Sequence, residues 1–295
     1  MLIQEKWSCD MLSRVCREPG DMLFADIYTK LRSKAEQIVG FAEPSKLFLQ
    51  KNGYTLPYLY PCNNYMDAIL SNGIVRSALQ SFSDKYCKKQ IQNIKLKGQL
   101  VSRSNYPNLY EILQSCYTSL DVEEFPEVYI TNQLKGINAL SVEIDNKPSI
   151  LISRKAVISL SDGELKFMIG HELGHILQGN LFCHTIKGVL DNIHNKSDVL
   201  GAVVSDMIEI PLNEWYRCSE FTSDRAGLIC CRNMEYVYQI MGRIKASESR
   251  SMAPEFMELY KIHPLIDKRR DELFKFYIST FNNDIPDIGM DYNSI

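Results

Sequence analysis

Two histidines with a glutamate between them form the pattern H-E-x-x-H at residues 171–175, in the stretch IGHELGHIL. Residues four positions apart lie on one face of an α-helix, so the imidazoles of His171 and His175 can converge on one cation. Glu172 is rotated away from them, and its carboxylate can reach a water molecule held by that cation. The pattern therefore predicts a metal site with hydrolytic chemistry.

Such a site needs a third protein ligand, because catalytic zinc commonly takes three and leaves its fourth position to water. The stretch WYRCSEFTSDRAGL places Glu220 and Asp224 one helical turn apart. We expect Glu220 to supply the third ligand from a second helix. We expect Asp224 to accept the N–H of a ligand histidine and so fix its tautomer. Without the histidine pair, two such acids would usually mark a solvated helix face.

Other positions bear on the choice of the third ligand. A metzincin has a further histidine six residues after the second one, and this chain has Leu181 there, which excludes that class. His184 and His194 lie in the stretch FCHTIKGVLDNIHNKSD, which is typical of a loop. We therefore expect both to be surface histidines and not metal ligands.

The helix that carries the histidine pair has recognisable ends. Ser161 and Glu164 form a capping-box pattern at its start, and an apolar stripe at three- and four-residue steps follows. Gly179 offers a stop. The second helix, which carries Glu220, is expected to begin near Pro211 because proline favours the first turn of a helix.

The remaining pattern predicts an α+β fold that is mostly helical, with a small β-sheet beside the active-site helix. Residues 1–50 have helical periodicity, as do residues 65–94 and 106–120. Between residues 128 and 152 Val and Ile are frequent and the turn sequence DNKP interrupts them, which predicts strands. Helical pattern then continues to residue 281.

Composition excludes several classes of protein. Of the 295 residues 45% are hydrophobic and 23% charged, and the net charge of -3 gives no sign of a nucleic-acid or anionic-membrane partner. The longest uncharged stretch, residues 52–66, is only 15 residues long and contains prolines, so no membrane span or signal peptide is expected. Nine cysteines without a C-x-x-C predict mostly reduced, buried thiols and a cytoplasmic protein.

These motifs together resemble the HtpX and CAAX-prenyl-protease family of gluzincin metallopeptidases, metallopeptidase family forty-eight. H-E-x-x-H is followed by R-x-x-E-x-x-x-D, which begins at Arg217 and whose glutamate, Glu220, comes after 44 intervening residues (176–219). The stretch INALSVEIDNKPSILIS resembles the strand before the active-site helix, with Asn138-Ala139 in the matching place. The stretch HPLIDKRRDEL matches a later H-P-x-x-x-x-R element. The resemblance covers roughly residues 65–275.

The resemblance implies a zincin-like fold and an endopeptidase with one Zn²⁺ per chain and a peptide or unfolded-protein substrate. It further implies that His263 lies by the metal and stabilises the oxyanion, and that Arg269 supports the site. Taken alone, His263 could cap the next helix, and Arg269 stands in the charged run DKRRDE, typical of a solvated face. The strand near Asn138 and Ala139 could pair with an extended substrate.

The chain also departs from the family. Many members are membrane-embedded or secreted, and prenylated substrates are not expected here. Position 223 is Ser where the family usually has Ala, a change that we expect to matter little. We divide the chain into a helical extension (1–60), a zinc metallopeptidase domain (61–285) and a tail (286–295). Alternatives are a latent or non-catalytic zinc-binding regulator and a chaperone-like peptide-binding module.

Overall fold

The computed structural model describes residues 56–61, 66, 70–145, 147–179, 181–184, 199–248 and 266–281. In this part the helices are α4 (Gly73–Lys97), α5 (Pro107–Ser119), α6 (Arg154–Ser159), α7 (Asp162–Gln178), α9 (Val199–Cys231), α10 (Met234–Glu248) and α12 (Ile266–Phe281). The strands are β1 (Gln99–Leu100), β2 (Glu127–Thr131), β3 (Ala139–Ile144) and β4 (Lys147–Ser153). The predicted α+β class, mostly helical with a small sheet, is confirmed.

The four strands form one mixed sheet in the order β1-β2-β4-β3. β2 runs parallel to β4, whereas β1 and β3 are antiparallel to their neighbours. β3 and β4 are joined by the turn that the sequence DNKP predicts. β3 is therefore one of the two edge strands of the described sheet, and it contacts α7.

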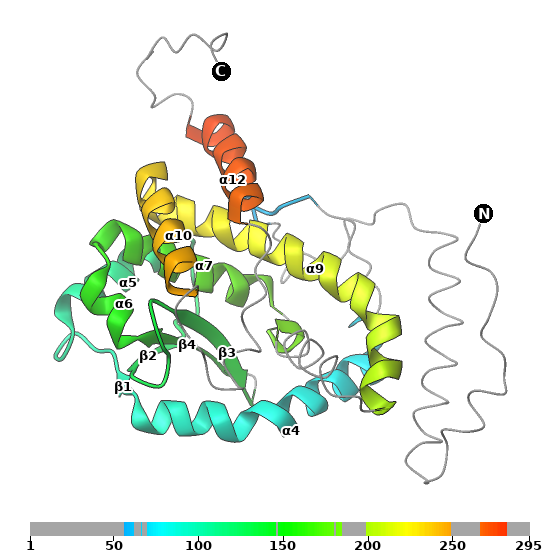
Figure 1. Cartoon of the computed structure of the whole chain (residues 1–295). Helices are drawn as coiled ribbons and strands as arrows, with labels where there is room; N and C mark the ends of the chain where they lie inside the picture. The colour runs from blue at the N-terminus through cyan, green and yellow to red at the C-terminus, as the bar shows by residue number, and fades with distance from the viewer. Residues whose placement is uncertain are drawn as a thin grey trace, which may run out of the picture.

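Helices cover both faces of the sheet (Figure 1). Successive side chains of a strand point to opposite faces. Ile150 and Ile152 of β4 belong to the main core, which α5 and α7 complete. Leu151 lies on the other face, where it packs with Ile91 and Ile94 of α4. The apolar run of β4 thus reflects a strand that is buried on both sides.

α7 begins and ends where the sequence predicts. The Ser161 side chain accepts a hydrogen bond from the Glu164 backbone N–H, and the Glu164 carboxylate accepts one from the Ser161 backbone N–H, which completes the capping box. Gly179, with a φ of 75°, follows the last residue of the helix. This left-handed conformation suits glycine.

α7 and α9 approach closely because small residues face each other along their contact. A Cβ added to Gly170 would lie 2.7 Å from the Sγ of Cys230, and one added to Gly174 would lie 2.7 Å from the Cα of Ser223. Real Cβ atoms do not come so close to other atoms. The two glycines therefore let the backbone of α7 rest almost directly on α9.

One sequence-based detail of the fold is wrong. α9 is already helical from Val199, so Pro211 lies in its interior and does not begin it. An interior proline removes one backbone hydrogen bond, and the rest of α9 continues through it. Cys116 and Cys230 are free thiols as expected, but Cys218 is disulfide-bonded.

Some expectations fall outside the described residues. The helical pattern of residues 1–50 and the tail at 286–295 lie there, and so does most of the proposed extension at 1–60. Within the described ranges, none of the helices combines the length and the apolar character that crossing a membrane requires. The boundaries of the proposed domains stay predictions.

Candidate metal centre

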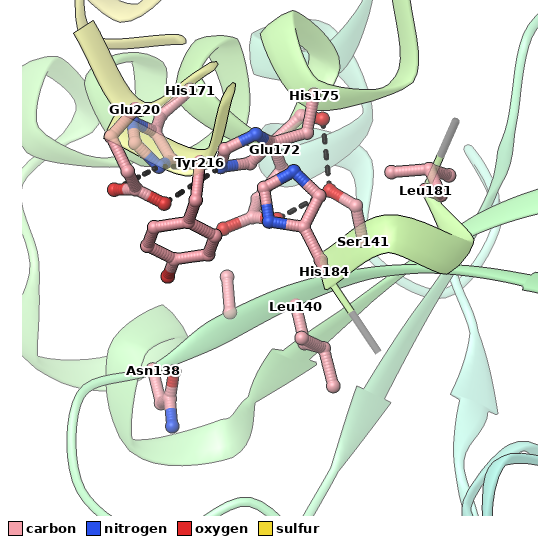
Figure 2. Close-up of a pocket in the computed structure, with 11 residues that line it drawn as sticks. Asn138, Leu140, Ser141, His171, Glu172, His175, Leu181, His184, Tyr216 and Glu220 are labelled. Carbon is pink, nitrogen blue, oxygen red and sulfur yellow. Dashed lines mark hydrogen bonds and ion pairs between the residues drawn. The ribbon is translucent and has the colours of Figure 1, made fainter. Parts of the chain in front are cut away.

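His171, His175 and Glu220 place three possible ligand atoms within 4.8 Å of one another. The Nε2 atoms of the two histidines are 3.0 Å apart. One carboxylate oxygen of Glu220 lies 3.7 Å from Nε2 of His171, and the other lies 3.4 Å from Nε2 of His175. Figure 2 shows both imidazoles beside the Glu220 side chain. All three residues are buried. Two imidazole nitrogens and a carboxylate oxygen form a donor set that catalytic zinc uses, so these residues fit a zinc ion.

Asp224 holds the ring of His171. Its Oδ1 lies 3.0 Å from Nδ1 of His171, one helical turn after Glu220 on α9. If Nδ1–H donates to this carboxylate, Nε2 keeps its lone pair for a metal. Burial lowers the pKa of His171, but the hydrogen bond to Asp224 and the charges of Glu220 and Asp224 raise it above its usual value overall.

Arg269 of α12 joins both acidic residues of α9. Its Nε donates to Oδ2 of Asp224 at 2.7 Å, and its Nη1 lies 3.0 Å from Oε2 of Glu220. Burial raises the pKa of Asp224, but the charge and hydrogen bonds of Arg269 outweigh this and lower it overall. Arg269 is itself buried, so it does not lie on a solvated helix face. Its guanidinium compensates two carboxylates that would otherwise be costly to bury.

Two serines of α9 contact the second histidine. Nδ1 of His175 lies 3.1 Å from the hydroxyl of Ser219 and 2.9 Å from that of Ser223. Gln178 donates from Nε2 to the Ser223 hydroxyl at 3.0 Å. The Oγ of Ser223 thus lies within hydrogen-bond distance of His175, and the expectation that a serine here matters little stays a prediction. An alanine would have no such atom.

Glu172 is held by the neighbouring edge strand. The hydroxyl of Ser141 on β3 donates a short hydrogen bond to the Glu172 carboxylate, and it lies 2.9 Å from the carbonyl oxygen of the same residue. Both residues are buried. Ser141 is not among the residues that the motifs single out, although its place two residues after Ala139 on the expected strand is a usable signal.

His184 lies in the site and not on the surface, so that expectation is wrong. Its ring centroid is 4.3 Å from that of His175, and its Nε2 lies 3.2 Å from the Ser219 hydroxyl. The rings of Trp215 and Tyr216 on α9 lie 4.9 and 5.2 Å from it. Residues 182–184 form a short helical turn that brings this ring back against α9.

A pocket lies between β3 and the three possible metal ligands (Figure 2). β3 and the residue before it, α7, the turn near residue 184 and α9 contribute to its wall. The lining residues are Asn138, Ala139, Leu140, Ser141, His171, Glu172, His175, Leu181, His184, Tyr216 and Glu220. Asn138 and Ala139, the residues expected to bind substrate, thus line this pocket.

Three further residues of the sequence predictions either lie outside the described residues or are exposed. His263 lies outside the described residues, and so does His194. Arg217, three residues before Glu220, is exposed. The structure therefore brings together the H-E-x-x-H motif, Glu220, Asp224 and Arg269.

The chain is similar to known peptidases. The sequence model of the family described as Peptidase family M48 matches residues 103–276, more than half of the 295-residue chain. A protein of Arabidopsis thaliana named plastoglobule-localized metallopeptidase 48, chloroplastic, is 26% identical over 146 residues, which make up 49% of this chain and 42% of that protein. This chain therefore matches less than half the length of that relative. No solved structure matches it.

Proposed function

Because this chain belongs to peptidase family M48, we propose that it is a zinc-dependent endopeptidase with one Zn²⁺ per chain. The observation that carries the proposal is the convergence of His171, His175 and Glu220, with the Glu172 carboxylate in the same pocket. A structural zinc site is usually closed by four protein ligands, whereas three ligands beside an open pocket suit catalysis.

The zinc ligands come from two helices, and their neighbours orient them. His171 and His175 would bind through Nε2 and Glu220 through its carboxylate. Asp224 would keep His171 in the tautomer that leaves Nε2 available. When bound, the zinc ion supplies Lewis acidity, which activates a water molecule and polarises the scissile carbonyl.

Glu172 is the proposed general base. Its carboxylate takes a proton from the attacking water and then passes it to the nitrogen of the leaving amine. Ser141 holds the carboxylate for this transfer. We further propose that His263 donates a hydrogen bond to the developing oxyanion, a contribution worth roughly 3 kcal/mol in comparable sites.

The proposed substrate is a peptide or an unfolded protein segment. β3 is an edge strand of the described sheet and lines the pocket. An extended peptide can add to such an edge through main-chain hydrogen bonds, with Asn138 and Ala139 at the near end of the strand. Because main-chain hydrogen bonds depend little on which side chains the peptide carries, we infer that the protein accepts extended segments of varied sequence.

Mass-spectrometric detection of peptide cleavage by the zinc-loaded protein tests the proposal, with Glu172→Gln alongside. We expect the wild type to cut peptides, and the variant to bind one zinc ion per chain and cut none, because the amide cannot accept the proton. Retained cleavage by Glu172→Gln would overturn the assignment of the base. Zinc binding without cleavage by either protein would favour a latent regulator or a chaperone-like module.

The cellular location stays a prediction. The cytoplasmic assignment rests on composition and on the cysteine pattern, and the disulfide at Cys218 runs against the second of these. The name of the Arabidopsis relative places that protein in the chloroplast. Fractionation of cells that express the tagged chain would decide between these compartments.

A further inference from the structure

A short segment that precedes the family-matched residues 103–276 packs against α9, which carries Glu220 and Asp224, and against α12, which carries Arg269. Residues 56–61 lie beside α9 and α12, and Figure 1 draws them in blue. The backbone N–H of Tyr60 donates to Oγ1 of Thr222 at 3.1 Å. Tyr58 is only 2% exposed and belongs to the main core. The segment is thus packed into the molecule and does not lie loosely on it.

Arg225 of α9 ties this segment to α12. Its Nη1 donates to the carbonyl oxygen of Leu59 at 2.9 Å. Its guanidinium carbon lies 4.8 Å from the ring centroid of Tyr60 and 4.7 Å from that of Phe276 on α12. A guanidinium plane can stack on an aromatic face while it donates hydrogen bonds at its edge. This one side chain of α9 therefore contacts two other parts of the chain, residues 59–60 and α12.

Tyr60 makes a second connection between the same two helices. Its ring centroid is 4.6 Å from that of Phe221 on α9, and its hydroxyl donates to Oε2 of Glu272 on α12 at 3.3 Å. Glu272 stands three residues after Arg269, so the two lie close together along α12.

The contacts of residues 56–61 with α9 lie beside the face of α9 that carries Glu220 and Asp224. Phe221 and Arg225 are four residues apart and share one face, which is rotated by about 100° from the face that carries Glu220 and Asp224. Arg269 joins α12 to that second face. α12 is therefore held to α9 at two neighbouring faces, once through the buried guanidinium and once through residues 56–61.

We propose that residues 56–61 form a strap that positions the zinc site, with Tyr60 as its main positioning residue. By holding α12 against α9, the strap keeps Arg269 on Asp224 and Glu220, and so keeps the Glu220 carboxylate aimed at the two histidines. The inference rests on the zinc site proposed above. It adds that a segment outside residues 103–276 determines how well that site binds its ion.

The test compares full-length Tyr60→Ala and Tyr60→Phe with the wild type. Zinc affinity is measured by competition with a coloured chelator, well below the melting temperature of each variant. We expect Tyr60→Ala to bind zinc roughly tenfold more weakly, the low end of the effect of residues that support metal ligands. Tyr60→Phe keeps the ring contacts with Phe221 and Arg225, and should stay within about threefold of the wild type.

Hydrogen exchange supplies a second measurement that needs no activity. In Tyr60→Ala we expect the amides of α12 to exchange faster while those of α7 stay protected. Tyr238→Ala is the matched control, because Tyr238 of α10 also contacts α12, through Arg270, but lies outside the strap. If this control weakens zinc binding as much as Tyr60→Ala does, any loosening of α12 suffices and the strap has no special role.

Arg225→Lys keeps the test valid if Tyr60→Ala does not fold. The lysine keeps the positive charge but loses the plane that spans two rings, so zinc affinity should again fall. Wild-type zinc affinity in a folded Tyr60→Ala would overturn the proposal. A wild type that binds zinc but cleaves no peptide would instead refute the endopeptidase and leave the strap unaffected.

Discussion

In the candidate metal centre, Nε2 of His171 and Nε2 of His175 lie close to each other. The Nδ1 atom of each ring lies within hydrogen-bond distance of side chains of α9. His171 meets Asp224 in this way, and His175 meets Ser219 and Ser223. Such contacts fix the ring planes before an ion arrives, so binding requires little rearrangement. The carboxylate of Glu172 is fixed in the same manner, from β3, through Ser141.

At the residue scale, Ser141→Ala should separate catalysis from metal binding. The alanine removes the O–H that holds the Glu172 carboxylate. We expect kcat to fall by about tenfold, because a hydrogen bond to a charged group contributes about 1.5 kcal/mol or more. Bound zinc should stay at one ion per chain, measured by atomic emission. Thr118→Ala is the control, because it removes a hydroxyl that is hydrogen-bonded within α5. An unchanged kcat in Ser141→Ala would refute the role of Ser141 in holding Glu172.

At the scale of elements, the contact between α7 and α9 decides whether the ligands meet. The H-E-x-x-H motif lies on α7 and Glu220 on α9, so the distance between the helices sets the size of the site. Gly170 and Gly174 allow that distance to be short. Since Gly174 stands between the two histidines proposed as zinc ligands, packing and the proposed metal binding depend on the same turn of helix.

Gly174→Ala should therefore damage stability and zinc binding together. Its Cβ would lie 2.7 Å from the Cα of Ser223, so α9 must move, at a cost of about 1–3 kcal/mol. Urea denaturation and the chelator titration measure the two effects.

Gly242→Ala on α10 is the matched control, because an added Cβ there meets no atom within 4 Å. This substitution should stabilise the protein by up to about 1 kcal/mol, since alanine favours the helix. Equal effects of the two substitutions would contradict the close-packing explanation of Gly174.

At the scale of the whole molecule, the site links parts of the chain that are far apart in sequence. β3 supplies Ser141, α7 the histidines, α9 the acids and α12 Arg269. Residues 56–61 in turn contact α9 and α12. An ion bound by α7 and α9 joins two of these elements. Zinc should therefore stabilise the entire fold and not only its own neighbourhood.

Removal of zinc by a chelator is expected to lower the melting temperature. A ligand that binds only the native state stabilises it by RT ln(1 + [L]/Kd), or about 2.7 kcal/mol when its free concentration is 100 times Kd. Differential scanning calorimetry with and without chelator measures the shift. In His175→Ala the same treatment should have almost no effect, and an equal shift there would show that the ion binds elsewhere.

The sequence alone determined the local features of this protein. The spacing of His171 and His175 sets one helical face, and Ser161 with Glu164 sets the start of α7, because helical period and capping depend on residues within one turn. The Val- and Ile-rich stretch likewise predicted the strands. The pairing of a distant acid with the histidines came from the chemistry of zinc and from the family resemblance.

Only the tertiary structure decided which side chains meet. It placed His184 against His175, Ser223 within reach of a histidine nitrogen, and Arg269 in the interior. None of these follows from periodicity, because each depends on how closely two helices pack and on where a chain turn returns. The contacts of Tyr60 join residues 162 and 212 positions apart, a separation at which local pattern carries no information and only packing selects the partner.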